Sequence, residues 1–223
     1  MKIVNEINDI SDSTKAIVRK ELNKLKYIKP NDFNEISFSD VTFTNFPVFD
    51  KNNNFCTGYL PVFANGEKNI SQAEHMERFM KLNIDTLPLI DVAKLLDIKV
   101  EKSNNIKPYG TYIHKERKIV LGSDYIVTFI HELVHAIVHF GKENDLFYLY
   151  DSEYDEIIAE FAAVTLCKIY NIKIDLPYSI YYMNMYNNDI ENSIPDHVIK
   201  TVEVICEFVK KCKEIINKRK NNK

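Results

Sequence analysis

The chain has 223 residues, of which 45% are hydrophobic and 27% are charged, and its net charge is −3. This length supports one well-packed core with a small additional module, and the charge excludes a general electrostatic attraction to nucleic acid. No segment approaches the roughly 18 uninterrupted apolar residues of a membrane span, and residues 1–6 lack the pattern of a signal peptide. We therefore predict a cytoplasmic protein without a membrane segment.

The spacing of the cysteines agrees with this compartment. The four cysteines include no CxxC pair and no regular disulfide spacing. Three of them, Cys167, Cys206 and Cys212, fall in helical patterns and are expected to be buried thiols. Free thiols suit a reducing cytosol.

Residues 1–65 are predicted to form a small N-terminal module. A helix is expected over 11–27, followed by aromatic-rich strands within 36–63 that are joined by a polar turn at 50–54. The polar, glycine-containing segment 64–67 marks the boundary of the module.

The aromatic side chains of this module allow two interpretations. They can stack on the bases of single-stranded DNA, but aromatic residues on short strands more often form a core. Residues 1–70 contain nine Lys or Arg and nine Asp or Glu residues, so no electropositive groove is expected there. Single-stranded DNA is therefore retained only as an alternative partner.

Residues 66–223 are predicted to form a second domain of the α+β class. Helices are expected at 71–82 and 88–96, strands at 99–102, 110–114 and 118–121, helices at 125–140 and 152–167, a tyrosine-rich helix after 177, and a long helix from 195. The long helix has an apolar stripe at steps of three and four residues, which predicts that it packs on the body of the domain. The stripe consists of Val198, Val202, Ile205, Val209, Cys212 and Ile216.

An HExxH motif, formed by His131, Glu132 and His135, lies in the apolar run 125–140. Residues four apart lie near one face of a helix, so both imidazoles can bind one metal ion. Glu132 is then placed beside a water bound to that ion, as a metal-assisted hydrolase requires. A surface helix with incidental histidines is the alternative, but the flanking apolar residues leave almost no polar face.

A third metal ligand is expected further along the chain. Metzincins carry a third histidine six residues after the second, where this chain has Gly141, so that class is excluded. His139 lies one helical turn beyond His135, too far along a rigid helix to join the same ion. We interpret His139 as a buried histidine, or one that supports the site from behind the ligands.

The next helix offers a better ligand. Ser152 is its expected N-cap, with Asp155 in the capping-box position. Glu156 and Glu160 share a face of this helix, and two acids on an apolar helix would repel without a cation or donors nearby. We predict that Glu156 is the third ligand, and that Glu160 accepts the outer N–H of a ligand histidine.

The order of these motifs resembles known zincin families. Tyr109-Gly110-Thr111-Tyr112, the strand at 118–121, the HExxH motif and the run from Glu156 through Ala163 match a glycine-containing hairpin, HExxH and E-x-x-A-E-F-A-A. This arrangement resembles the ImmA/IrrE metallopeptidases and, more closely, the C-terminal domain of ArdC-type antirestriction proteins. The run 59–65 followed by Gln72 also resembles the ArdC type.

This resemblance implies a zincin-like fold, one Zn²⁺ ion per chain and an origin in a mobile element or phage. It also implies that Glu156 is the third ligand. We expect a zinc-dependent metallopeptidase that hydrolyses peptide bonds of a specific intracellular protein, with Glu132 as general base on a zinc-bound water. The alternative is an antirestriction-type protein that binds single-stranded DNA or a DNA-modifying enzyme, with the zincin site structural or vestigial.

Substrate binding can be predicted only in outline. We expect the strand at 118–121 to lie at a sheet edge, where an extended peptide could pair with it. The oxyanion of the reaction needs a hydrogen-bond donor. The candidate donors are Tyr154, Tyr148 and His114, with Tyr150 and Tyr112 as further choices.

Overall fold

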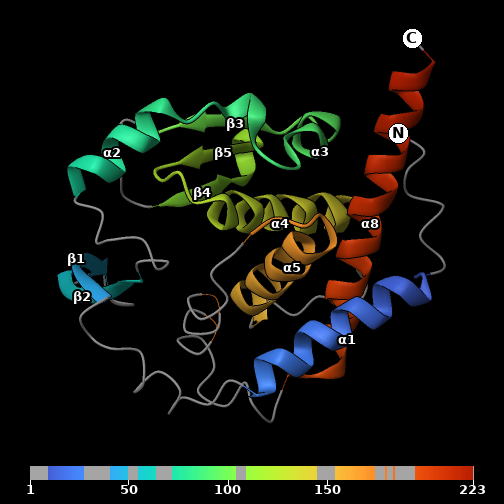
Figure 1. The fold of residues 1–223 in the computed structure, drawn as a ribbon, viewed down its shortest axis with the longest axis horizontal. Coiled ribbons are helices and arrows are strands. Elements are labelled where there is room, and N and C mark those ends of the chain that lie inside the picture. Colours follow the sequence, from blue (N-terminus) through green and yellow to red (C-terminus); the bar gives the residue numbers. More distant parts are fainter. Residues whose placement is uncertain are drawn as a thin grey trace.

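The computed structural model describes residues 10–27, 41–49, 55–63, 72–103, 109–144, 154–173, 179, 183 and 194–222. The helices are α1 (Asp12–Tyr27), α2 (Gln72–Lys81), α3 (Ile90–Leu95), α4 (Ile126–Glu143), α5 (Asp155–Ile169) and α8 (Asp196–Asn221), with 3-10 turns η4 (Ile84–Thr86) and η5 (His114–Glu116). The strands are β1 (Val41–Phe49), β2 (Phe55–Phe63), β3 (Lys99–Lys102), β4 (Gly110–Ile113) and β5 (Lys118–Leu121). The fold is therefore α+β, mostly helical with small sheets, which confirms the predicted class (Figure 1).

The three-stranded sheet has the order β3-β5-β4, with β3 parallel and β4 antiparallel to β5. The prediction that residues 118–121 form an edge strand is therefore wrong, because β5 is the central strand. A short alternating segment has the same pattern in the middle of a sheet as at its edge, and the long-range pairing with β3 decides the order. Within the described residues, β4 forms the edge of the sheet nearest the HExxH motif.

Helix α4 is the central helix of the core. It lies between the sheet and α5 in Figure 1. Its Phe129, Ile130 and Leu133 are fully buried, and Ile119 and Leu121 of β5 are buried on the other side of this interface. The side of α4 that faces the core is apolar, and the polar side chains of its motif lie at the border of this buried surface.

Helix α8 packs along α5, α3 and α1. Every residue of its predicted apolar stripe is buried, and the three predicted helical cysteines are buried and free. At the start of α1, Thr14 Oγ1 donates to Glu207 Oε2 of α8 at 2.6 Å, and Ser11 Oγ donates to the same oxygen at 2.8 Å. These two hydrogen bonds connect the start of α1 to α8.

The division of the chain at residue 65 stays a prediction. Strands β1 and β2 form an antiparallel hairpin with Val41 opposite Phe63 and Phe49 opposite Phe55. The expected turn at 50–54, the boundary at 64–67 and the tyrosine-rich segment after 177 lie outside the described residues. Helix α1 belongs by sequence to the N-terminal part, yet it packs against α5 and α8 (Figure 1).

Candidate metal centre

Helix α4 places the HExxH side chains at the boundary between the core and a cavity. His131 is 6% exposed and Glu132 is 9% exposed, although both are polar. Buried polar groups require partners because their desolvation is costly. The position of these side chains therefore calls for groups that face them from neighbouring elements.

Helix α5 supplies the first of these groups. It begins at Asp155 with Tyr154 as N-cap, so the observed N-cap is two residues after the predicted one, Ser152. Ser152 lies outside the described residues. Glu156 and Glu160 are one turn apart on the side of α5 that faces α4. The prediction that these two carboxylates share a face agrees with their common partner, His131.

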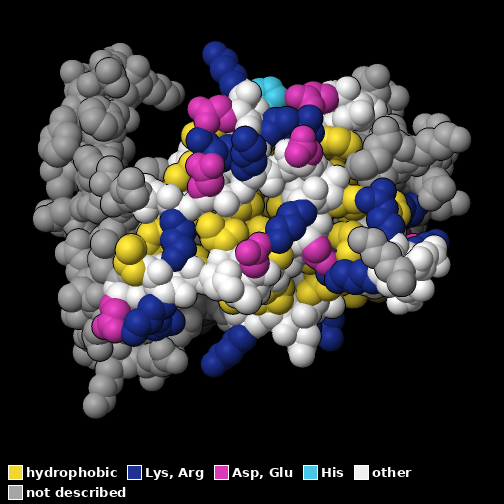
Figure 2. Space-filling model, turned by 90° about the horizontal axis from the view of Figure 1, so that it is seen from above, with side chains coloured by type: hydrophobic (Ala, Val, Ile, Leu, Met, Phe, Trp, Pro, Cys, Tyr) yellow, Lys and Arg dark blue, Asp and Glu magenta, His cyan; other side chains and the backbone are white. Residues whose placement is uncertain are grey.

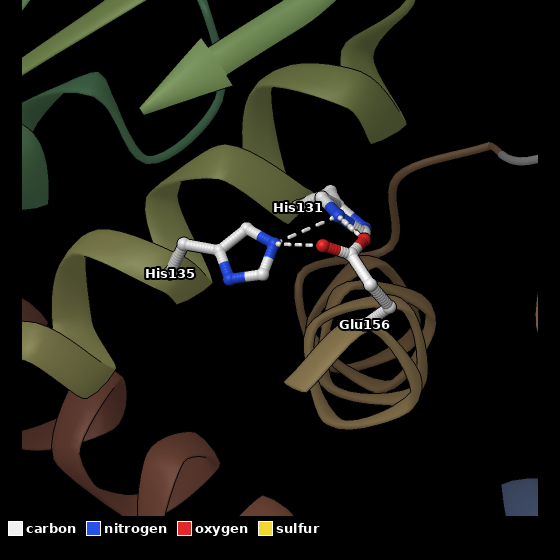
Figure 3. A group of neighbouring side chains, drawn as sticks. All are labelled: His131, His135 and Glu156. Atoms are coloured by element: carbon white, nitrogen blue, oxygen red, sulfur yellow. Dashed lines mark hydrogen bonds and ion pairs between the residues drawn. The ribbon is translucent and has the colours of Figure 1, made fainter. Parts of the chain in front are cut away.

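The ligand atoms of His131, His135 and Glu156 lie within 4.8 Å of one another. His131 Nε2 is 3.1 Å from His135 Nε2 and 3.1 Å from Glu156 Oε2, and His135 Nε2 is 3.5 Å from Glu156 Oε1. Figure 3 shows the two imidazoles from α4 and the carboxylate from α5 pointing toward one another.

These separations fit a metal ion. Four tetrahedral ligands that are each about 2.0–2.1 Å from zinc lie roughly 3.3 Å from one another. The two distances from His131 Nε2 are close to that value. The distance from His135 Nε2 is to the second carboxylate oxygen of Glu156, so a rotation of this carboxylate would bring one oxygen close to both rings around an ion. Two imidazoles and one carboxylate are also a donor set that leaves a coordination position for a water or a substrate.

Glu160 supports this group from behind. Its Oε2 lies 2.8 Å from His131 Nδ1, and the residue is 3% exposed. A carboxylate at Nδ1 keeps the proton on that nitrogen and leaves Nε2, with its lone pair, facing the ligand group. Glu160 is therefore placed as predicted for an acceptor of the outer N–H.

In the absence of an ion, a second proton on the His131 imidazole compensates part of the negative charge of the carboxylates around it. Burial alone would lower the pKa of His131, but the hydrogen bonds with Glu156 and Glu160 outweigh it and raise the pKa to about 10. Burial would raise the pKa of Glu156, and its hydrogen bonds with His131 and His135 lower it well below the usual range. A cation bound here would take the place of the proton, since metal ligands must be deprotonated.

The cluster opens into a cavity of about 400 Å³. The cavity is lined by Gly110, Thr111 and Tyr112 of β4, by His131, Glu132, His135 and His139 of α4, and by Asp155 and Glu156 of α5. Burial is the largest influence on Glu132 and raises its pKa, while the charges of His131 and His135 lower the pKa in part. The candidate base thus faces the same space as the three candidate ligands.

Of the candidate oxyanion donors within the described residues, Tyr112 alone lines the cavity. Tyr154 packs edge-on against His197, and His114 stacks on His139 with ring centroids 4.2 Å apart. Tyr148 and Tyr150 lie outside the described residues. Burial raises the pKa of Tyr112, which keeps its phenol protonated as a donor at neutral pH.

His139 lines the cavity but stands outside the ligand group. Its stack with His114 and its contact with the Tyr112 ring, at 5.6 Å, hold it against β4. Burial, followed by the charge of His114, lowers the pKa of His139.

Three cavity residues were not predicted as site residues from the sequence. Asp155 was assigned to helix capping, and Gly110 and Thr111 were given no role in the site, because β4 was not expected to be the strand beside the motif.

The described surface gives little support to a nucleic-acid interface. Figure 2 shows one face of the molecule, on which Lys and Arg side chains lie among Asp and Glu side chains and apolar ones. Several charged side chains of the described residues are paired, as in the Lys94–Asp85 and Lys81–Glu77 ion pairs. Among the described helices, none has the length and apolar character needed to traverse a bilayer.

Comparison with known proteins gives a limited answer. No family model matches the chain, and no curated protein matches it. Two solved structures are similar, both of the antirestriction protein ArdC from plasmid R388. The metal-free form has 17% identity and a TM-score of 0.37, and the Mn(II)-bound form has 14% identity and a TM-score of 0.35. Each match covers 78% of this chain and 68% of the ArdC chain.

The similarity agrees with the ArdC part of the predicted resemblance and does not extend to the ImmA/IrrE part. TM-scores below 0.5 carry no assignment of fold or function. The zincin-like fold therefore stays a proposal. The structure itself is that of an α+β protein with a His-His-Glu group beside a buried glutamate.

Proposed function

We propose that this chain is a metal-dependent peptidase with a zincin-like fold that hydrolyses peptide bonds of a specific intracellular protein. One observation carries the proposal: the candidate ligands His131, His135 and Glu156, whose ligand atoms lie within 4.8 Å of one another, share a cavity with Glu132, which is not needed to hold the ion. A purely structural metal site does not need a buried carboxylate that faces the cavity without binding the ion.

The ion is proposed to be Zn²⁺, one per chain, held by His131, His135 and Glu156. The donor set suits zinc, and an imidazole–carboxylate set also accepts manganese. A similar structure is described as Mn(II)-bound, so manganese is the second ion to test. When bound, the cation would polarise a substrate carbonyl and make a nearby water more acidic.

The side chains around the ion would have different roles in the reaction. Glu160 keeps the His131 ring oriented, and Glu132 accepts the proton of the attacking water and passes it to the leaving amine. Tyr112, the one phenol among the cavity residues, is the proposed donor to the developing oxyanion.

Strand β4 replaces β5 as the proposed substrate strand. Gly122 N–H donates to Tyr109 C=O at 2.8 Å, which makes these two residues a hydrogen-bonded pair of the ladder. Because such pairs alternate in an antiparallel ladder, Thr111 pairs with Val120, and the main-chain groups of Gly110 and Tyr112 turn away from β5. An extended peptide along that side would pass the cavity.

The test begins with metal-free protein loaded with one equivalent of zinc or manganese. We expect cleavage of a proteome-derived peptide library, read by mass spectrometry, and loss of cleavage in Glu132→Gln with metal content unchanged. The control is Glu143→Gln, at the end of the same helix, whose side chain is about half exposed. Equal cleavage by the wild type and Glu132→Gln would exclude the proposal.

The alternative function is antirestriction by binding single-stranded DNA or a DNA-modifying enzyme. Both similar structures are of an antirestriction protein, so this function is tested as well. The two functions differ in their need for the base. If Glu132→Gln protects incoming DNA from restriction in cells as well as the wild type does, the protein acts by binding.

A further inference from the structure

Gly110 of β4 leaves no room for a side chain beside Glu132. A methyl group at this position would lie 2.9 Å from Glu132 Cγ, 3.2 Å from Glu132 Oε1 and 2.6 Å from Thr128 Cγ2. The backbone of Gly110 is not in the left-handed region, so space alone requires a glycine here. Any side chain would push β4 and the Glu132 carboxylate apart.

The Glu132 carboxylate lies against this strand. Glu132 lines the same cavity as three consecutive residues of β4, Gly110, Thr111 and Tyr112, and α4 packs directly on β4. The missing side chain of Gly110 permits this close approach. Glu132 therefore lies between the main chain of β4 and the helix that carries it.

We infer that Gly110 is a positioning residue for Glu132: by leaving room for the carboxylate against β4, it fixes the proposed base beside the ligand group. This inference rests on the proposed peptidase function. It goes further by assigning to a glycine outside the HExxH motif the control of where the base stands. Misplacement of a reacting group by about 1 Å can reduce a rate by roughly 100-fold.

The variants separate base positioning from packing. Gly110→Ala introduces both close contacts, whereas Gly110→Ala with Thr128→Ser removes the Thr128 methyl and leaves the conflict with Glu132. Thr128→Ser alone is the matched control. If Gly110 positions the base, the double variant should regain thermal stability but keep a kcat about 100-fold below the wild type, with zinc content and KM little changed.

A second readout needs neither metal nor activity. The side-chain carboxyl carbon of Glu132, followed by NMR in the metal-free protein and assigned with Glu132→Gln, reports the surroundings of the carboxylate. We expect its chemical shift to change in Gly110→Ala and to the same degree in the double variant, because both place a methyl group against Glu132. Thr128→Ser alone should leave the chemical shift unchanged.

The outcomes are distinct. An unchanged Glu132 carboxyl resonance in the double variant, or a kcat restored to the wild-type value, would overturn the positioning role and leave only packing. If the wild type cleaves no peptide, the proposed function fails, and the carboxyl resonance still decides whether Gly110 sets the place of Glu132.

Discussion

At the level of single residues, Glu160 shows how a carboxylate that binds no ion can set the affinity of a metal site. It is buried, and its hydrogen bond to His131 Nδ1 orients the ring and increases the basicity of Nε2. The ligand histidine therefore depends on a partner from a different helix. Loss of that partner should lower the affinity for the metal ion even though every ligand remains.

Glu160→Gln should weaken zinc binding by about 10- to 100-fold, the usual effect of removing such a partner. The change keeps the size of the side chain and removes its charge. Competition with a chromophoric chelator measures the affinity, and Glu143→Gln, outside the cavity, serves as the control. An unchanged affinity would mean that His131 does not act as a ligand through Nε2.

His131→Ala should lose the metal altogether, because only two ligands remain. Metal analysis of the purified variant measures this directly. A stoichiometric ion in His131→Ala would place the metal elsewhere in the chain.

At the level of elements, the junction of α1 and α8 illustrates how the chain ends are joined. Burial would raise the pKa of Glu207, but hydrogen bonds from Thr14 and Ser11, together with the charge of Lys210, lower it overall. The folded state therefore binds this proton less readily than the unfolded chain does. The resulting stability is present at neutral pH and is lost as the pH falls below about 4.3, the unfolded value, toward the lower native value.

Thr14→Val should lower the free energy of unfolding by about 1.5–3 kcal/mol at pH 7, because it removes a hydrogen bond to a buried charge. Urea unfolding at pH 7 and at pH 4 measures the difference, which should be smaller at the lower pH. Ala16→Ser, on the exposed side of α1, should change stability by less than about 0.5 kcal/mol. A pH-independent difference would contradict the role of Glu207.

The sequence predicts elements better than it predicts their neighbours. The strands at 99–102 and 118–121 match the structure residue for residue, because alternation of apolar side chains is a local signal. The central position of β5 depends on pairing with β3 and β4, which no local pattern contains. Asp155 was likewise assigned to capping, since its exposure to the cavity depends on where α5 begins.

At the level of the whole molecule, the candidate ligands come from two helices that are separate in the chain. A bound ion would join α4 to α5 in the folded state and would have no preformed site in the unfolded chain. Ion binding and folding are therefore coupled, and the metal should act on global stability.

Zinc at 100 times its dissociation constant should add about 2.7 kcal/mol to the free energy of unfolding and raise the Tm. Calorimetry with and without zinc measures the shift, and a chelator should reverse it. His135→Ala removes one ligand and should abolish the shift. An equal shift in the wild type and His135→Ala would show that zinc acts at another place.

The three buried thiols provide built-in probes of local opening. Burial raises the pKa of both Cys167 on α5 and Cys212 on α8 to about 12, and neither thiol is exposed. An alkylating reagent can therefore reach them only during excursions that separate the packed helices. In a Cys56→Ser background, zinc should slow the labelling of Cys167, which shares its helix with Glu156, more than that of Cys212. Mass spectrometry of timed samples would then show how far from the metal site a bound ion suppresses local opening of the core.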